Sequence, residues 1–317
     1  MRMTRSICEN ASIQRWVWLS VAAVALSLGE SPPAMAVASI GCAPRAIAWS
    51  HASFQAERMG NRVTADISMA ELPAATEQAD FLQSPKGTAF KPSGREVVKI
   101  SVRIRVDIIG RRPLWLENHA WLDPRDGTPI YLIRTRAGLE DYYQQFRFTR
   151  EGVFRRQREP GSAAEAAGPP ESWSKLGEHF YAYPKGERCH PVLETSALLY
   201  LLSTAPAKMI QDLSPLCVFN KRQLHRVSLQ TAPVAAVGFD YLEKKGETEA
   251  RRSGTTQARR IRIQSRPIGS YRGEVEDFFR EDTQVGLSLE GGLPLTGSCE
   301  LPLIGRVEMK LREIRLK

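Results

Sequence analysis

Residues 98–108 read VKISVRIRVDI, and this stretch decides the fold class. Charged or small polar residues separate apolar residues at every second position, namely Val98, Ile100, Val102, Ile104, Val106 and Ile108. A period of two matches the alternation of side chains along a β-strand and does not fit an amphipathic helix. The sequence therefore predicts a long strand with one dry face and one charged face.

Short turns separate this strand from further strand-like segments on both sides. Residues 111–113 and 123–129 are rich in turn-forming residues, and residues 73–94 are predicted to be a polar loop. Further strands are predicted near residues 47–57, 62–71, 114–122, 130–136, 141–149, 153–158, 178–183, 216–219, 223–230, 235–243, 258–263, 275–279, 285–290 and 306–316. Consecutive strands joined by short turns indicate an antiparallel meander.

The last predicted strand changes phase within its own length. Val307, Met309 and Leu311 share one parity, whereas Ile314 and Leu316 have the other. A β-bulge near Arg312 and Glu313 would return both groups to one face and bend the strand. We therefore predict a mainly β fold, with a strongly curved antiparallel sheet or a partly closed β-barrel.

One segment is predicted to be helical. Residues 192–202 are rich in leucine and end before Pro206, which favours a helix that serves as a plug or lid for the sheet. Residues 161–170 read GSAAEAAGPP, and this composition predicts a flexible insert at about residues 160–171. Residues 37–317 are otherwise expected to form a single β-rich domain.

The N-terminus has the features of an export signal. Three arginines precede residues 16–28, an uncharged apolar run, and Ala34-Met35-Ala36 resembles a signal peptidase site. The run is short for a membrane-spanning helix, and prolines follow it. We predict a signal peptide over residues 1–36, cleaved near Ala36, and a periplasmic location. An uncleaved membrane anchor and a lipoprotein lipidated at Cys42 are the alternatives.

The net charge of the chain limits the kinds of partner that an exported protein is expected to bind. The full chain has 44 basic and 35 acidic residues. Removal of residues 1–36 takes away three arginines and two glutamates, which leaves a net charge of +8. Export removes access to nucleic acid, so anionic lipids and anionic envelope polymers are the expected partners. The basic residues form small groups at residues 111–112, 155–158, 251–252 and 259–260, as is typical of solvated turns and strand faces.

Four cysteines remain after removal of the signal: Cys42, Cys189, Cys217 and Cys299. An even number of cysteines in an oxidising compartment favours two disulfides. Three pairings are open, and Cys189 with Cys217 and Cys42 with Cys299 is the favoured one. A zinc site that uses His179, His190 and the neighbouring cysteines lacks the usual paired spacing.

Several segments together resemble a known family. These segments are WLDP at residues 121–124 with GTP at 127–129, residues 142–148, LETSALLYLLS at 193–203 and GRVEMKL at 305–311. Over roughly residues 47–317 the chain is similar to the exported bacterial domain-of-unknown-function family 3108. The resemblance implies a curved sheet or half-barrel, as in periplasmic lipoprotein carriers, with a helix that plugs an apolar interior. It implies no catalytic residues.

The chain offers only weak candidates for catalysis or metal binding. The sequence has no GxSxG, HExxH, GxxxxGK[ST], CxxC or GxGxxG motif. Glu117 and His119 share a strand face and could act as an acid/base pair, although a structural role is more common. Asp123 and Asp126 could bind calcium, but turns favour the same residues. No catalytic, cofactor or metal residue is predicted, and the protein is not expected to be an enzyme.

The remaining functional prediction depends on shape. A curved sheet must cover its dry face with its own side chains, a helix or a ligand. We predict that a lipid or other amphiphile binds in the interior, against a lining of Val98, Ile100, Val102, Ile104, Val106, Leu198 and Leu201. One alternative is an envelope structural or interaction protein with a filled core that binds anionic cell-wall or lipopolysaccharide groups. Another is an outer-membrane β-barrel.

Overall fold

The computed structural model describes residues 47–138, 140–184, 191–204, 210, 213, 215–220, 222–268, 283–290, 292–301 and 304–317, with only the backbone described at 299–301. The chain divides into two units, Met1–Val37 and Ala38–Lys317, and every described residue belongs to the second. The predicted signal peptide, Cys42, Cys189 and the predicted strand at residues 275–279 lie outside the described residues.

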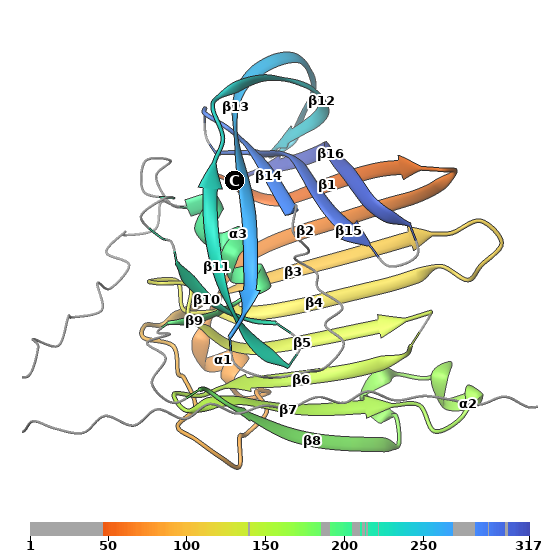
Figure 1. Ribbon diagram of the computed structural model, residues 1–317, viewed down its shortest axis with the longest axis vertical. Helices are drawn as coiled ribbons and strands as arrows, with labels where there is room; N and C mark the ends of the chain where they lie inside the picture. Colours follow the sequence, from red (N-terminus) through yellow and green to blue (C-terminus); the bar gives the residue numbers. More distant parts are fainter. Residues whose placement is uncertain are drawn as a thin grey trace, which may run out of the picture. The chain divides into compact units, whose positions relative to one another are not determined.

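The first half of the unit is an antiparallel meander of eight strands (Figure 1). Its strands are β1 (Trp49–Arg58), β2 (Asn61–Pro73), β3 (Glu96–Asp107), β4 (Leu114–Leu122), β5 (Pro129–Ala137), β6 (Tyr142–Phe148), β7 (Gly152–Glu159) and β8 (Lys175–Ala182). Each strand pairs with the next one along the chain. These strands confirm the meander that the alternation predicts.

The second half extends the same sheet from β1. The further strands are β9 (Val192–Glu194), β10 (Leu216–Asn220), β11 (Gln223–Thr231), β12 (Ala235–Lys245), β13 (Thr248–Pro267), β14 (Thr283–Ser288), β15 (Pro294–Leu301) and β16 (Gly305–Leu316). From β1 the hydrogen-bonded order is β16, β15, β14, β13, β11, β10 and β9, while β12 pairs with β13 and β16. The β9–β10 and β12–β16 pairs are parallel, so the predicted purely antiparallel sheet is a mixed one. Helix α3 (Thr195–Thr204) lies in the β9–β10 connection, as parallel pairing requires a crossover.

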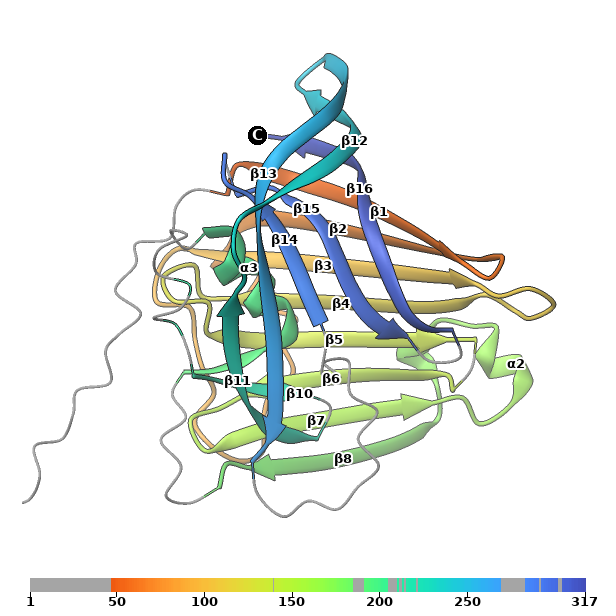
Figure 2. The same ribbon diagram turned by 45° about the horizontal axis from the view of Figure 1, so that its top comes forward.

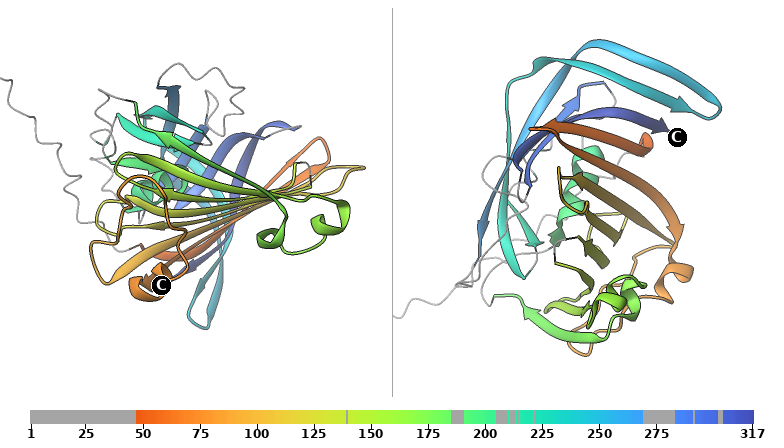
Figure 3. Two further views of the ribbon diagram at one scale, coloured as in Figure 1. Left: turned by 90° about the horizontal axis from the view of Figure 1, so that it is seen from below. Right: turned by 90° about the vertical axis from the view of Figure 1, so that its right-hand side faces the viewer.

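The sheet curves around α3, as the end-on view in Figure 3 shows. Phe219 of β10 contacts Phe146 and Phe148 of β6, each with ring centroids 6.1 Å apart. Phe219 also lies 5.6 Å from the ring of Tyr181 in β8. Because these contacts join strands from the two ends of the hydrogen-bonded order, the described part of the sheet folds back on itself. The prediction of a mainly β fold with a strongly curved sheet is confirmed.

The phase change in β16 is a bulge at the predicted place. Ser53 of β1 pairs with Glu313, and the next residue, Phe54, pairs with Leu311, so Arg312 is an extra residue in β16. Leu311 and Ile314 are both buried in the main core despite their opposite parity. The bulge therefore restores the dry face of β16.

The segment at residues 192–202 differs from the prediction of a continuous helix. Residues 192–194 form β9, and α3 begins only at Thr195. A Glu194 carboxylate oxygen accepts a hydrogen bond from the backbone N–H of Ala197 at 2.6 Å. Such a bond satisfies one of the free donors at a helix start, which explains why the helix begins there.

Two segments that the sequence predicts to be loops contain short helical elements. The predicted insert contains α2 (Ala163–Ala166) and a 3-10 turn (Pro170–Ser172), and Trp173 after it is buried. The predicted polar loop contains α1 (Ala74–Gln78) and lies over the outer face of the meander, where it buries Phe81 against Trp121 and Tyr131. Two apolar clusters thus lie on opposite faces of the sheet, the larger one around α3.

Candidate functional site

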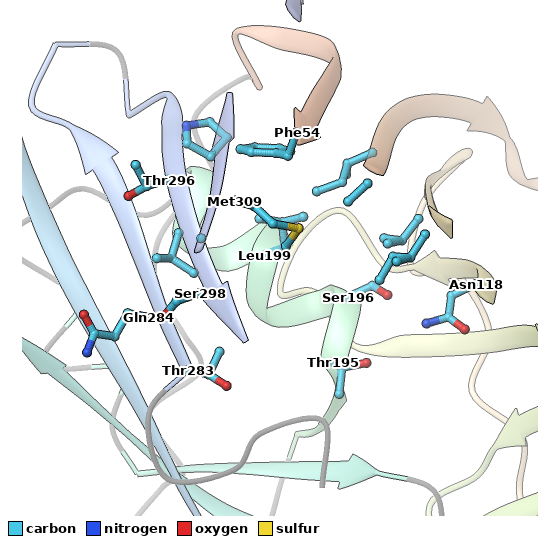
Figure 4. Close-up of a pocket in the computed structure, with 17 residues that line it drawn as sticks. Phe54, Asn118, Thr195, Ser196, Leu199, Thr283, Gln284, Thr296, Ser298 and Met309 are labelled. Carbon is cyan, nitrogen blue, oxygen red and sulfur yellow. The ribbon is translucent and has the colours of Figure 1, made fainter. Parts of the chain in front are cut away.

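An apolar cavity of about 190 Å³ lies between α3 and the inner face of the sheet (Figure 4). Its apolar walls come from strands β1 to β3 and β14 to β16 and from Leu199 of α3. Its polar lining residues include Asn118, Thr195, Ser196, Thr283 and Ser298. The lining is almost wholly apolar by area, so the space favours a hydrocarbon group over water.

Strand alternation explains how the walls form. In β3, Val102 and Ile104 point inward, while Arg103 between them is exposed on the outer face. Across the β2–β3 ladder, Ala65 pairs with Ile104 and Ile67 pairs with Val102, and both β2 residues also line the cavity. The small side chain of Ala65 leaves space that a larger residue would fill.

The predicted lining residues separate into two groups. Val102 and Ile104 line the cavity, whereas Val98, Ile100, Val106, Leu198 and Leu201 are buried in the surrounding core without lining it. All seven therefore lie in or against one core, but only two of them reach the open space.

Sequence reasoning missed several side chains that line the cavity, and α3 shows why. Leu199 faces the cavity, while Leu201 turns toward Gly127 in the β4–β5 turn. The Tyr200 hydroxyl donates to the Pro124 carbonyl at 2.7 Å, which fixes the rotation of the helix. A leucine-rich helix gives no signal of that rotation, because all of its faces are apolar.

A buried cation lies beside the polar end of the cavity. Arg134 of β5 donates from Nε to Asn118 Oδ1 at 3.3 Å, and its guanidinium lies 5.6 Å from the Phe146 ring. Arg134 also interacts electrostatically with Glu194, whose pKa is raised chiefly by complete burial. Asn118 therefore connects the cavity to a buried cationic group.

The inner face becomes more polar from β5 to β7. Gln144 donates to Gln157 at 2.7 Å, and Arg155 lies 5.4 Å from the ring of Tyr181. The expectation that residues 155–158 form a solvated face holds for Arg156, which pairs with Glu178 at 2.8 Å on the outer face. It is wrong for Arg155, because strand alternation directs neighbouring side chains to opposite faces.

A second cavity, of about 120 Å³, is polar. Arg260, Arg306 and Glu308 contribute to its walls, and all three side chains are exposed. It shares Gln284, Thr296, Gly297 and Ser298 with the apolar cavity, so strands β14 and β15 contribute to both spaces.

The Glu117–His119 pair belongs to a hydrogen-bonded series on the outer face of β3 and β4. Ser101 Oγ lies 2.8 Å from His119 Nδ1, and His119 Nε2 lies 3.3 Å from Glu117 Oε1. Burial lowers the pKa of His119, although Glu117 opposes that effect. The three residues lie within paired strands, where backbone N–H groups take part in the ladder and are not aimed at a reacting oxygen. The series therefore lacks the geometry of an acyl-transfer site.

The two aspartates of the β4–β5 turn have structural partners. Asp123 accepts from Ser93 N at 2.7 Å and from Arg125 N at 2.9 Å, and Asp126 accepts from Thr128 N at 2.9 Å. The bonds from Arg125 N and Thr128 N are the typical role of aspartate in turns, and the bond from Ser93 N joins the turn to a segment 30 residues away. Among the described residues, no group of three potential ligands could hold a metal ion.

The cysteine pairing stays a prediction. Cys217 lies in β10 near the core, and the described backbone of Cys299 pairs with Val307. Cys42 and Cys189 lie outside the described residues, so neither of the favoured pairs is tested.

Comparisons with known proteins identify no family for the chain. No family model matches it, so the resemblance to family 3108 has no support from that comparison. No curated protein matches either. No helix among the described residues is long and apolar enough to cross a membrane. The fold is similar to a crystal structure of a β-barrel-like protein of domain of unknown function 1849 from Brucella abortus, with a TM-score of 0.44, 8% identity, and coverage of 86% of this chain and 99% of the other.

Proposed function

We propose that this protein is an exported periplasmic protein that binds the apolar chain of an amphiphile between α3 and the curved sheet. The observation that carries this proposal is the apolar cavity of about 190 Å³. Protein interiors are close-packed and contain few large voids. An engineered apolar cavity of about 150 Å³ admits benzene, so the present space suffices for a small hydrocarbon group.

The volume also limits the ligand. Pockets that hold drug-sized ligands measure roughly 300 to 1,000 Å³, which exceeds the cavity by a clear margin. The cavity therefore fits a short segment of one hydrocarbon chain and not a whole two-chain lipid. The remainder of the amphiphile would lie outside the cavity.

The polar end of the cavity favours an anionic head. Asn118 presents a side-chain amide to the space, and Arg134 lies directly behind it with a permanent positive charge. Thr195 and Ser196 add hydroxyl groups at the start of α3. A carboxylate or phosphate near Asn118 would gain charge-assisted hydrogen bonds that a cationic head would not.

The test is calorimetric titration of the purified protein with decanoate, decanol and decyltrimethylammonium. We expect saturable binding of decanoate, weaker binding of decanol and the weakest binding of the cation. Ala65→Leu extends a buried side chain into the cavity and should weaken decanoate binding by about tenfold or more, since each buried methylene contributes about 0.8 kcal/mol.

The matched control is Ala232→Leu, because Ala232 is exposed and does not line the cavity. Decanoate should bind this variant as it binds the wild type. Absence of saturable binding to the wild-type protein, or equal binding to both variants, would contradict the proposal.

A second candidate is a protein with a filled core that binds anionic envelope polymers through its outer face. Arg260 and Arg306 favour it, since both are exposed beside the polar cavity. In that case Arg260→Gln would weaken retention on an anionic polymer matrix, while Ala65→Leu would have no effect on any binding measurement.

A further inference from the structure

Two turns at one end of the meander form a single surface. The β1–β2 and β3–β4 turns lie side by side at the right-hand end of the sheet in Figures 1 and 2. The backbone N–H of Ile109 donates to Asn61 Oδ1 at 3.1 Å, and Arg62 pairs with Asp107 across the ladder. We name this surface the turn patch, made up of Arg58, Met59, Arg62, Arg105, Ile109, Arg111, Arg112 and Trp115.

Exposed apolar side chains concentrate on the turn patch. Met59 is 85% exposed, Ile109 is 71% exposed and Trp115 is 39% exposed. They are three of the six exposed large apolar residues among those the structure describes, and the others are dispersed along the chain. Single exposed apolar residues are ordinary, but a group of them on adjacent turns marks an interaction surface.

The backbone at Met59 is a second, independent observation. Met59 has φ +51° and Gly60 has φ +77°, the left-handed pair of a primed hairpin turn. Asn, Asp or Gly ordinarily occupies the first of these positions, because a larger side chain disfavours positive φ. The chain thus places a strained and exposed methionine where asparagine would stabilise the turn. A contact made outside the fold would explain that choice.

The turn patch is also basic. Its five arginines face two nearby carboxylates, Glu57 and Asp107, which leaves a net charge of +3. Glu57 pairs with Arg62 at 3.3 Å and Asp107 pairs with Arg105 at 2.8 Å. Arg105 also lies 5.0 Å from the Trp115 ring.

Three arginines of the turn patch lie outside these ion pairs. Arg58 donates to the Arg306 carbonyl, while Arg111 and Arg112 are exposed. The next turn of the meander carries Glu140 and Asp141, so the positive surface ends there. Cations beside exposed apolar residues fit a surface that is both anionic and apolar underneath.

We propose that the turn patch docks onto the surface of an anionic phospholipid bilayer. Met59 and Ile109 enter the headgroup region, Trp115 lies at the interface, and the arginines contact lipid phosphates. This inference goes beyond the proposed function and does not depend on a ligand in the cavity. Phe54 of the cavity wall is four residues along β1 from Arg58, about 13 Å, so docking would bring the cavity close to the bilayer.

The test is sedimentation of the full mature chain with vesicles of phosphatidylglycerol and phosphatidylcholine, compared with vesicles of phosphatidylcholine alone. We expect binding to the anionic vesicles and little to the neutral ones. Met59→Asn combined with Ile109→Asn should reduce the partition coefficient by about tenfold, since two apolar side chains leave the headgroup region. Asparagine suits the left-handed position at residue 59, so this variant should fold, and thermal unfolding checks that it does.

The matched control is Val234→Asn with Leu289→Asn, which removes two exposed apolar residues outside the turn patch. A charge test uses two double variants. One combines Arg111→Gln and Arg112→Gln in the turn patch, and the other combines Arg150→Gln and Arg222→Gln, an equal change of charge at exposed sites elsewhere. Only the turn-patch variants should lose binding. An equal loss of vesicle binding in the controls would overturn the proposal. A loss of binding in the arginine variant, with no effect of the Met59 and Ile109 substitutions, would also overturn it and would indicate that the protein adsorbs to any polyanion. Decanoate binding should stay unchanged in every one of these variants, which separates this proposal from the proposed function.

Discussion

Glu194 is a fully buried carboxyl group at the junction of β9 and α3. It accepts a hydrogen bond from Ala197 N, and Arg134 acts on it electrostatically. Burial is the largest influence and raises its pKa above the ordinary value of 4.5. The folded protein therefore holds the proton of Glu194 at pH values where the unfolded chain has released it. The stabilising contribution is present below pH 4.5 and is lost as the pH rises through the raised pKa.

Glu194→Gln should remove this dependence on pH. Glutamine retains an oxygen that accepts from Ala197 N, but it does not ionise. We expect the free energy of unfolding of the variant to rise relative to the wild type as the pH increases above 4.5. Urea unfolding over a pH series measures this difference, with Glu96→Gln at an exposed position as the control. A difference that stays constant with pH, or that falls, would show that Glu194 does not titrate in this way.

At the scale of the element, the bulge in β16 determines which side chains enter the core. Arg312 shifts the register against β1, so Leu311 and Ile314 both face inward. The sequence contains this information because the parity of the apolar residues changes within one strand. The start of α3 could not be predicted in the same way, since a short apolar pair such as Val192 and Leu193 fits a buried helix and a buried strand equally well.

Deletion of Arg312 should be tolerated, because the residues that remain can pair with β1 in a regular register. Glu313 would still face Ser53, and Ile314 would still face Ala52 on the buried side of the sheet. We expect the deletion to change the free energy of unfolding by about 1 kcal/mol or less, as most changes at exposed positions do. Ile314→Ala removes a fully buried side chain and should cost about 2 kcal/mol or more. Denaturant unfolding of both variants checks this, and a deletion as costly as Ile314→Ala would show that Arg312 does more than occupy the bulge.

Strands without alternation show the limit of sequence reasoning about elements. β15 contains Pro294 and Gly297, both of which disfavour strands, so no strand is predicted there. β13 begins ten residues before the strand that is predicted from residue 258. The sequence does not predict this first half as strand, because it is mostly exposed and polar. In both cases the neighbouring strands stabilise a conformation that the local sequence does not favour.

For the described unit as a whole, the sequence predicts the curvature of the sheet but does not predict the cavity. The alternation in β3 correctly assigns Val98, Ile100, Val102, Ile104 and Val106 to the inner face. Which of them meet open space depends on where α3 and β16 approach the sheet, and these elements are far from β3 in the sequence. Val102 and Ile104 reach open space beside two small lining residues, Ala65 on the neighbouring strand β2 and Gly297 on β15. Contacts of this kind depend on the tertiary fold and leave no local pattern.

Native mass spectrometry of the protein purified from an envelope fraction would show whether the cavity holds a ligand. We expect a near-stoichiometric bound mass in the wild-type protein, released by organic solvent and identified as a single-chain anionic amphiphile. Ala65→Leu should lose this mass and Ala232→Leu should retain it, because only Ala65 lines the cavity. A bare polypeptide mass for the wild-type protein, or the same bound mass in Ala65→Leu, would contradict the claim that the cavity is a binding site.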